Sequence, residues 1–435
     1  MKKNMAKKNS NLWDVIIIGA GASGLMAAVT AARAGQRVLI LEQKNDIGKK
    51  ILATGNGKCN FTNQKIDSSC YNGEKKLIEL VFSRFTRDNC LDFFHEIGIF
   101  PKEKNGYYYP NSETAVSVVE AFRQELKRCK ITVMTETCVQ EISPKYVGFD
   151  VRTDKGVFTG SKLIIAVGLL ASPKLGSDGS LMNEIKELGH GFTPIVPALC
   201  GFYANGLNFK KVQGVRVRTS VTLELEKEIL GQDTGEVQLT DYGISGIPVF
   251  QISRMASMGL YHKKAPIVHM NFLPDLTKED LIEEMNFRRA RFQDSETLST
   301  LFNGLLPQKL IEALLLEEKL DKNISILELT DQQCKKMCHR IQNCSVTLTK
   351  SRGFEFAQVC AGGIRTEDVD AETLESRLVK GLYFAGEILD VDGICGGYNL
   401  QWAWTSGYVA GQAASETGRS KIYEEIKHKR NDHRG

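Results

Sequence analysis

A glycine-rich motif near the N-terminus constrains the fold of this chain more than any other feature. The apolar residues 15–18 lead directly into Gly19-Ala20-Gly21-Ala22-Ser23-Gly24. A continuous β-branched run of this kind is typical of a buried parallel strand. Gly19 permits a tight turn, Gly21 lets the backbone approach a pyrophosphate, and Gly24 allows close packing of helix on strand. The motif therefore predicts a strand–turn–helix unit that binds a dinucleotide.

The residues that follow complete this unit. Residues 25–34 are rich in strong helix formers, and Gly35 is suited to the end of that helix. Residues 38–41 form a second apolar run, which Glu42 follows directly. A carboxylate in this place, roughly 20 residues after the glycines, accepts hydrogen bonds from ribose hydroxyls. An ordinary βαβ unit with a glycine-rich turn is the alternative.

A second glycine-rich turn lies near the other end of the chain. Residues 381–387 lead to Gly393-Ile394-Cys395-Gly396-Gly397, and we expect a strand over 382–385 and a helix that starts near Asn399. Gly396 and Gly397 would let the positive N-terminal end of this helix come close to a bound ring. Glu387, after the strand, is a second candidate carboxylate, with a helix or turn cap as the alternative. The two motifs together predict a chain that leaves a dinucleotide-binding domain and returns to complete it.

Between the two motifs the chain makes a long excursion. Helical spacing predicts a helix over 113–129, and residues 131–142, 146–154 and 157–167 predict three strands. Residues 196–272 are β-rich, with the clearest strand over 212–225. Residues 276–340 are helical, with helices over 280–285, 298–305 and 308–317. The predicted division is a disordered end (1–12), a first part of the cofactor domain (13–195), a β-rich insertion (196–272), a helical insertion (273–345), a second part of the cofactor domain (346–418) and a polar tail (419–435).

Composition favours a cytoplasmic enzyme. The chain has 435 residues and a net charge of +4, but its two ends carry more than all of that charge, so the body between them is slightly acidic. This charge balance argues against a nucleic-acid partner. No stretch reaches the ~20 apolar residues that a membrane helix needs. Eleven cysteines without framework spacing are typical of a reducing compartment. The oligomeric state is left open.

The stretch Lys49-Lys50-Ile51-Leu52-Ala53-Thr54-Gly55-Asn56-Gly57-Lys58-Cys59-Asn60-Phe61-Thr62-Asn63 resembles the diagnostic segment of the BaiN-like, or aminoacetone-oxidase-like, flavoproteins. The closing segment 381–403 and the landmarks 240–246 and 361–364 are similar to the same family. The resemblance covers residues 13–416. It implies FAD, a Rossmann-like two-dinucleotide-binding α/β fold with inserted subdomains, and redox chemistry on a small organic substrate. The sequence departs from the family pattern at Thr54, Asn56, Lys58 and over 166–169.

The motifs and the resemblance together predict the residues that bind FAD. Among them, the resemblance places Glu387 on the ribityl chain. The full set is Gly19, Gly21, Ala22, Ser23, Gly24, Glu42, Gln43, Lys50, Thr54, Gly55, Gly57, Cys59, Asn60, Val139, Ala166, Gly168, Gly386, Glu387, Gly396, Gly397, Asn399 and Leu400.

The predicted reaction is hydride transfer from reduced flavin to an activated double bond of a small substrate, which the resemblance suggests is steroid- or bile-acid-like. NAD(P)H would reload the flavin as a transient co-substrate, because the chain has no second glycine-rich dinucleotide motif. Two alternatives stay open. One is an amine or alcohol oxidase that produces hydrogen peroxide, and the other is a flavin-binding redox sensor without turnover. Modification of nucleic acid is disfavoured by the acidic body.

No catalytic residue is assigned from the sequence. Tyr242, Cys395 and Tyr398 are candidates for the substrate face. Cys59 and Cys395 have no close partner cysteine, so we interpret both as packing residues. Residues 334–344 contain three cysteines and a histidine without paired-knuckle spacing, and no metal site is predicted.

Overall fold

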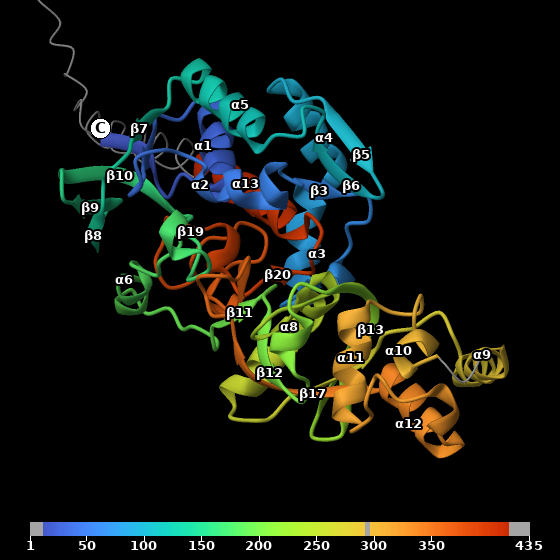
Figure 1. Ribbon diagram of the computed structural model, residues 1–435. Helices are drawn as coiled ribbons and strands as arrows, with labels where there is room; N and C mark the ends of the chain where they lie inside the picture. Colours follow the sequence, from blue (N-terminus) through green and yellow to red (C-terminus); the bar gives the residue numbers. More distant parts are fainter. Residues whose placement is uncertain (1–11, 292–295, 417–435) are drawn as a thin grey trace, which may run out of the picture. The chain divides into compact units, whose positions relative to one another are not determined.

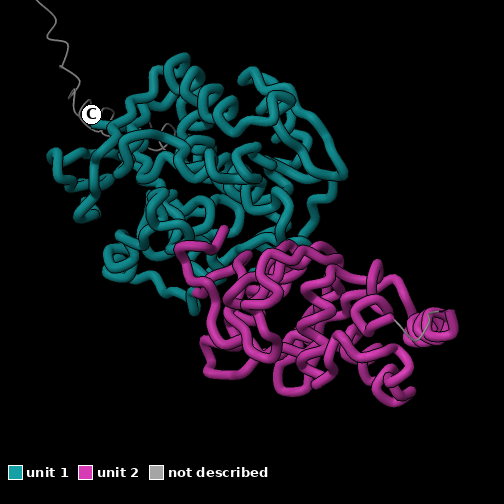
Figure 2. Tube along the Cα trace, in the orientation of Figure 1, with its two compact units in different colours: residues 1–195, 359–435 teal, residues 196–358 magenta. Residues whose placement is uncertain are grey.

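The computed structural model describes residues 12–291 and 296–416, and it divides into two compact units (Figure 2). The first unit is built from residues up to 195 and from 359 onward, and the second is residues 196–358. The predicted end 1–12, apart from Leu12, and the predicted tail 419–435 lie outside the described residues.

The first unit contains a sheet of seven strands within the described residues, in the order β7-β2-β1-β10-β9-β8, and β19 also pairs with β10. Figure 1 labels β7, β8, β9, β10 and β19 of this sheet. The strands β7, β2, β1, β10 and β19 run parallel, whereas β9 and β8 return as an antiparallel meander. The strands are β1 (Leu12–Ile18), β2 (Val38–Leu41), β7 (Thr132–Met134), β8 (Val139–Pro144), β9 (Phe149–Thr153), β10 (Gly156–Ile165) and β19 (Leu382–Phe384).

Short strands and helices surround this sheet. The short strands are β3 (Thr62–Asn63), β4 (Tyr71–Asn72), β5 (Pro101–Lys104), β6 (Tyr107–Pro110), β18 (Val359–Ala361) and β20 (Asp392–Gly393). The helices are α1 (Ala22–Arg33), α2 (Lys49–Ala53), α3 (Lys75–Arg84), α4 (Arg87–Glu96), α5 (Ala115–Arg128), α6 (Met182–Glu187) and α13 (Tyr398–Glu416).

The first and last helices of the described chain pack against each other. A Cβ atom built on Gly407 of α13 would lie 2.4 Å from the Ser23 carbonyl oxygen, and one on Gly411 would lie 2.6 Å from that of Ala27. These contacts are too short for any side chain, so the two glycines allow the backbones of α1 and α13 to touch. The C-terminal helix therefore rests directly on the helix of the dinucleotide motif.

The strand predicted over 131–142 is two strands in the structure. β7 ends at Met134 and joins β2 in parallel, and β8 begins at Val139 and pairs antiparallel with β9. Between them, Glu136 has a left-handed φ of 51°, and its N–H donates to the Lys44 carbonyl at 2.9 Å. The chain is thus turned away from one edge of the sheet by hydrogen bonds to a distant loop, which periodicity does not reveal.

The second unit combines a closed barrel with a group of helices. The barrel order is β12-β15-β14-β13-β16-β17. The strands of the unit are β11 (Val196–Ala198), β12 (Phe202–Asn205), β13 (Arg216–Leu225), β14 (Glu228–Leu239), β15 (Gly243–Gly246), β16 (Ile267–Asn271) and β17 (Cys344–Ser351). The helices are α7 (Phe209–Val212), α8 (Ile247–Tyr261), α9 (Lys278–Arg291), α10 (Leu298–Leu301), α11 (Gln308–Glu317) and α12 (Asp331–Gln342).

Several predicted bounds in the second unit are corrected by the structure. The cofactor domain was expected to resume at 346, but β17 pairs with β12 and β16 of the barrel, so the first unit resumes at Val359. The strand expected over 212–225 begins at Arg216, because residues 209–212 form α7 and Gly214 turns with a φ of 85°. The helix expected over 298–305 ends at Leu301, and that over 280–285 extends across Lys278–Arg291.

Candidate functional site

The glycine-rich loop at the start of α1 contains three glycines, and a side chain would be affected differently at each of them. Gly19 has a φ of 99°, and a Cβ on it would lie 2.6 Å from the Ala166 carbonyl oxygen. A Cβ on Gly24 would lie 1.9 Å from the Gly19 oxygen. Gly21 has an ordinary extended backbone, and a Cβ on it would meet no atom within 4 Å. Among the described glycines, Gly21 alone has neither a left-handed φ nor a neighbour that a Cβ would touch.

The position of Gly21 in the fold explains the empty space beside it. It is the N-cap residue of α1, so it stands beside backbone N–H groups that have no partner within the helix. The open space over Gly21 lies where those N–H groups and the helix dipole attract an anion. These residues fit the pyrophosphate of a dinucleotide, since a group from outside the chain explains a glycine that the fold itself does not need.

Glu42 follows β2 and is buried beside this loop. Its Oε2 accepts a hydrogen bond from the Ala20 N–H at 2.7 Å, and its Oε1 accepts one from the Lys44 N–H at 2.8 Å. Burial raises the pKa of the Glu42 carboxyl, and the two backbone hydrogen bonds oppose that rise. Each carboxylate oxygen keeps a further lone pair. The side chain is therefore fixed in place and still able to accept hydrogen bonds from ribose hydroxyls.

A second carboxylate joins the early and late segments of the chain. Glu387 Oε2 lies 2.7 Å from Lys50 Nζ, and Glu387 Oε1 accepts a hydrogen bond from the Cys360 N–H at 2.7 Å. A Cβ on Gly168 would lie 3.8 Å from Glu387 Oε2. Three predicted cofactor residues, Lys50, Gly168 and Glu387, thus meet at one place in the first unit.

The second glycine turn is enclosed by the segment that follows α2. The Asn63 side-chain amide donates to the Gly396 carbonyl at 2.9 Å. A Cβ on Gly396 would lie 2.9 Å from the Tyr107 ring, and one on Gly397 would lie 2.7 Å from the Thr62 carbonyl oxygen. Both glycines have left-handed φ values, 133° and 91°. The turn is glycine-rich because neighbouring parts of the chain leave no room for side chains at these two positions, whether or not a ligand is bound.

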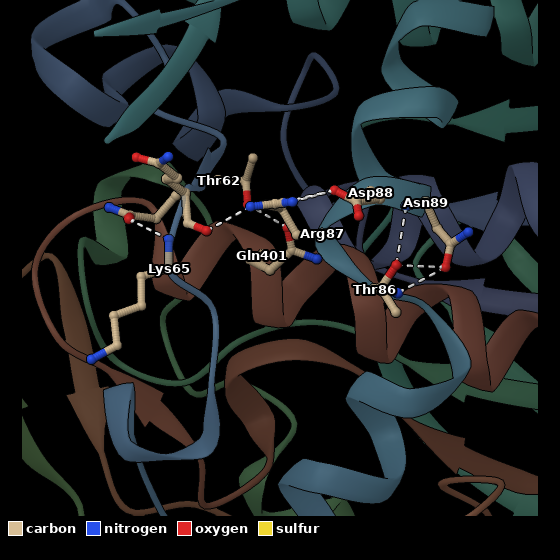
Figure 3. Close-up of polar contacts among 9 residues, drawn as sticks. Thr62, Lys65, Thr86, Arg87, Asp88, Asn89 and Gln401 are labelled. Carbon is tan, nitrogen blue, oxygen red and sulfur yellow. Dashed lines mark hydrogen bonds and ion pairs between the residues drawn. The ribbon is translucent and has the colours of Figure 1, made fainter. Parts of the chain in front are cut away.

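A buried hydrogen bond between side chains fastens α13 to the same segment. Thr62 Oγ1 donates to Gln401 Oε1 at 2.6 Å (Figure 3), and the Trp404 indole donates to the Phe61 carbonyl at 3.0 Å. Gln401 and Trp404 are completely buried. Both hydrogen bonds are shielded from water, which would otherwise compete for the same polar atoms. They therefore fix the position of α13 relative to residues 61–63.

The remaining predicted cofactor residues occupy varied surroundings. Ser23 donates to the Ala385 carbonyl, and Gln43 donates to that of Gly176. Asn399 exchanges two 2.8 Å hydrogen bonds with Gly393, which occupies its amide in shaping the turn. Gly55 and Gly57 are exposed, and Val139 begins β8 opposite Thr153. The other predicted positions that flank these contacts are Ala22, Thr54, Asn60, Ala166, Gly386 and Leu400. Their roles toward FAD remain predictions.

The substrate-face candidates belong to different units, with Tyr398 and Cys395 in the first and Tyr242 in the second. Tyr398 is buried, and its ring lies edge-on to Tyr71 at 5.9 Å between centroids. Burial raises the pKa of its phenol well above the usual value. Cys395 is half-buried in the glycine turn. Tyr242 belongs to the second unit, so its proposed contact with substrate stays a prediction.

Cys59 is fully buried, and this environment determines its chemistry. Burial raises the pKa of its thiol to about 12, although a hydrogen bond with Thr54 opposes the rise. A thiol with such a pKa stays protonated at neutral pH and is a poor nucleophile. No disulfide partner for it lies among the described residues. Within the same residues, no group of three potential ligands is placed to hold a metal ion.

Sequence reasoning missed the residues that support the second glycine turn. Tyr107 and Asn63 contact Gly396 from distant parts of the sequence, and Gln401 bonds to Thr62 across 339 positions, so no local pattern marks these residues as partners. The run of three tyrosines at 107–109 was a local signal for the contact with the turn, because alternate side chains of β6 lie on opposite faces and one face can meet Gly396.

Comparisons with known proteins agree with this geometry. The sequence profile described as "HI0933-like protein Rossmann domain" matches residues 13–413. The chain is 44% identical over 403 residues to the 3-dehydro-bile acid delta(4,6)-reductase of Clostridium scindens, covering 92% of this chain and 98% of that protein. It is 30% identical over 405 residues to the ribosomal RNA dihydrouridine synthase of Escherichia coli, covering 92% and 97%.

A solved structure also matches most of the chain. It is the 3-ketosteroid-delta4-(5alpha)-dehydrogenase from Rhodococcus jostii, which aligns with a TM-score of 0.47 and 13% identity over 95% of this chain and 99% of that one. In the part of the chain that the structure describes, no helix is long and apolar enough to cross a membrane.

Proposed function

The chain belongs to the HI0933-like family of flavin-dependent oxidoreductases, and from this we propose that it is an FAD-dependent reductase of a conjugated carbon–carbon double bond in a small, steroid-like substrate. The observation that carries the proposal is the 44% identity, along nearly the whole of both chains, to a reductase of a 3-dehydro-bile acid. The family assignment agrees with a first unit in which Ser23 of the first glycine motif donates to the Ala385 carbonyl of the closing segment.

The residues of the first unit would hold FAD in a defined order. The N-terminus of α1 with Gly21 would receive the pyrophosphate, and Glu42 would accept hydrogen bonds from the adenosine ribose. The pair of Lys50 and Glu387 would lie along the ribityl chain, and the turn at Gly396 and Gly397 would face the isoalloxazine. When bound, FAD supplies hydride transfer to and from carbon centres. The protein supplies binding, orientation and exclusion of water.

The source of the reducing equivalents is a finer part of the proposal. We propose NADH or NADPH as a transient co-substrate. The sequence contains a single strand–GxGxxG–helix unit, at residues 15–34, and FAD would occupy it. A nicotinamide nucleotide would then reach the flavin without a Rossmann unit of its own.

A second candidate function is reduction of uracil in ribosomal RNA, which the 30% identity to a ribosomal RNA dihydrouridine synthase favours. The two reactions share their chemistry, because each saturates a double bond conjugated with a carbonyl group. The expectation that nucleic acid is excluded rests only on the slightly acidic body of the chain. Higher identity to the bile-acid enzyme makes the small-molecule reaction our first proposal.

One experiment separates these functions. The FAD-loaded protein is supplied with NADH or NADPH and either a 3-oxo-Δ4 steroid acid or an RNA fragment that contains uridine, and products are weighed by mass spectrometry. The proposal predicts a steroid product heavier by two hydrogens and nucleotide consumption that depends on the steroid. Two added hydrogens in RNA alone would establish the second function. Peroxide formation with an amine or alcohol, without either product, would indicate the oxidase.

A further inference from the structure

The second unit holds an arginine among aromatic rings at one end of its barrel. Arg352 directly follows β17, and its N–H donates to the Gly201 carbonyl at 2.9 Å. Its guanidinium carbon lies 4.1 Å from the centroid of the Tyr242 ring and 4.0 Å from that of Phe356. The Tyr203 ring is 5.7 Å away. We call these four residues the Arg352 cluster.

Strand register brings the cluster together. Phe202 of β12 pairs with Ser351 of β17, and Tyr203 pairs with Gly243 of β15. Arg352, Tyr203 and Tyr242 are therefore neighbours across three adjacent strands, each at the point where a strand begins or ends. The Thr240–Gly246 landmark in the sequence thus supplies one ring of the cluster, a role that the proposed reaction does not use.

No anionic partner for the charge of Arg352 lies among the described residues. Within residues 12–291 and 296–416, no carboxylate forms an ion pair with it, and its Nε is buried without a hydrogen-bond acceptor. Arg216 and Arg218 of the same unit, by contrast, pair with Glu236 and Asp275. Buried donors in proteins are nearly always satisfied, so an orphaned guanidinium nitrogen requires an explanation.

Because Nε itself is buried, a ligand would bind the guanidinium through its terminal nitrogens, and the surroundings determine which ligand fits there. A planar fork of N–H donors matches a carboxylate in two parallel hydrogen bonds, and aromatic rings against its faces hold it in one orientation. Phe356 is 56% exposed and Tyr203 is 39% exposed, so apolar ring surface remains free beside the charge. Phosphate sites gather several cations or backbone N–H groups, whereas this cluster offers one cation and three rings.

We propose that the Arg352 cluster is a binding site for the carboxylate of an apolar organic acid, with Arg352 as the ligand of the carboxylate and the exposed rings as the surface for its apolar body. The site is complete within the second unit and does not depend on the proposed reduction. Binding is therefore measurable without NAD(P)H and without turnover.

The test is calorimetric titration of the full-length, FAD-loaded protein with 2-naphthoate, its uncharged analogue 2-naphthamide, and inorganic phosphate. We expect one naphthoate per chain, with naphthamide weaker by about tenfold or more, as loss of a charged hydrogen-bonding pair implies. Phosphate should not displace naphthoate at comparable concentration. Equal affinity for naphthamide, displacement by phosphate, or no binding of naphthoate would each overturn the proposal.

Variants locate the site. Arg352→Gln should weaken naphthoate binding about tenfold or more, and Arg352→Lys should restore it only in part, because an ammonium lacks the planar fork. Phe356→Ala removes an exposed ring, leaves the fold intact, and should weaken binding about three- to tenfold. The matched control Arg216→Gln removes an exposed arginine of the same unit and should change nothing. Undiminished binding by Phe356→Ala, or a loss in Arg216→Gln as large as that in Phe356→Ala, would overturn the assignment even where Arg352→Gln fails to fold.

Discussion

Lys50 Nζ lies 2.7 Å from Glu387 Oε2, and this ion pair joins two segments that are 337 residues apart in the sequence. Both side chains are less than a third exposed, so water screens the pair only in part. Glu387 is held from its other side by the Cys360 N–H. The early and late parts of the first unit therefore depend on each other for the charge balance of the candidate site.

The ion pair should contribute measurably to stability. A double-mutant cycle of Lys50→Met and Glu387→Gln, followed by denaturant unfolding, should give a coupling energy of about 1–2 kcal/mol. The exposed pair of Arg216 and Glu236, at 62% and 63% side-chain exposure, is the control and should give less than about 0.5 kcal/mol. Equal coupling in both cycles would mean that Lys50 and Glu387 behave as an ordinary surface pair.

Gly21→Ser should separate cofactor binding from folding. The extended backbone of Gly21 suits serine, and serine is a favoured N-cap residue, so the free energy of unfolding without FAD should be unchanged or slightly higher. The added Cβ occupies the space proposed for the pyrophosphate, so FAD affinity should fall by about tenfold or more. Calorimetry and thermal unfolding with and without FAD measure both effects.

Gly24→Ser is the control variant for Gly21→Ser. Its Cβ would lie 1.9 Å from the Gly19 oxygen, so the variant should unfold more readily even without FAD. If Gly21→Ser binds FAD as tightly as the parent protein, the pyrophosphate is not at the N-terminus of α1.

Removal of the Glu42 carboxylate should weaken FAD binding. Glu42→Ala should cost about 1–3 kcal/mol of binding free energy, because charged hydrogen bonds to the ribose are lost. Glu42→Gln keeps one acceptor oxygen and should lose less. Retention of FAD by Glu42→Ala through extended dialysis, at the level of the parent, would contradict the ribose role.

Gly396→Val should disturb the surroundings of the flavin ring. The position has a φ of 133°, and a Cβ there would press on Tyr107 and Tyr398. We expect a shifted visible absorption spectrum and an altered reduction potential of the bound flavin. A spectrum and potential identical to those of the parent would place the ring elsewhere.

Cysteine alkylation should depend on burial and pH. Because the pKa of Cys59 is raised to about 12, its reactive thiolate is scarce at neutral pH and becomes appreciable only as the pH rises toward that value. Cys138 is exposed and should react with iodoacetamide at pH 8, while Cys59 should not. Mass spectrometry of peptides from the native protein measures both sites. Comparable labelling of Cys59 at pH 8 would show that it is a reactive thiol.

The sequence predicted those parts of the fold that local patterns encode. Apolar runs, glycines and a terminal acid lie within residues 15–42, and β1, α1, β2 and Glu42 follow them closely. The break between β7 and β8 was missed, because the residues on both sides are apolar and hydrogen bonds to residues 42 and 44 redirect the chain. The true return at Val359 was missed because the partners of β17 are themselves far away in sequence.

In the candidate site too, local patterns were predicted and contacts between distant residues were not. Both glycine-rich turns were predicted, because their glycines form local patterns that are visible in the sequence. The contact of Asn63 and Tyr107 with Gly396, and the bond from Thr62 to Gln401, exist only after folding. Propensity and spacing carry no signal for such pairs.

The most direct test of the account is anaerobic mixing of the purified, FAD-loaded protein with NADH and, separately, with NADPH, while the visible absorption band of the flavin is followed. The account predicts that the protein binds one FAD per chain and that one of the two nucleotides bleaches the band rapidly. Bleaching should reverse when a conjugated steroid ketone is added. A protein that takes up no FAD would contradict the central claim that the two ends of this chain build one flavin site.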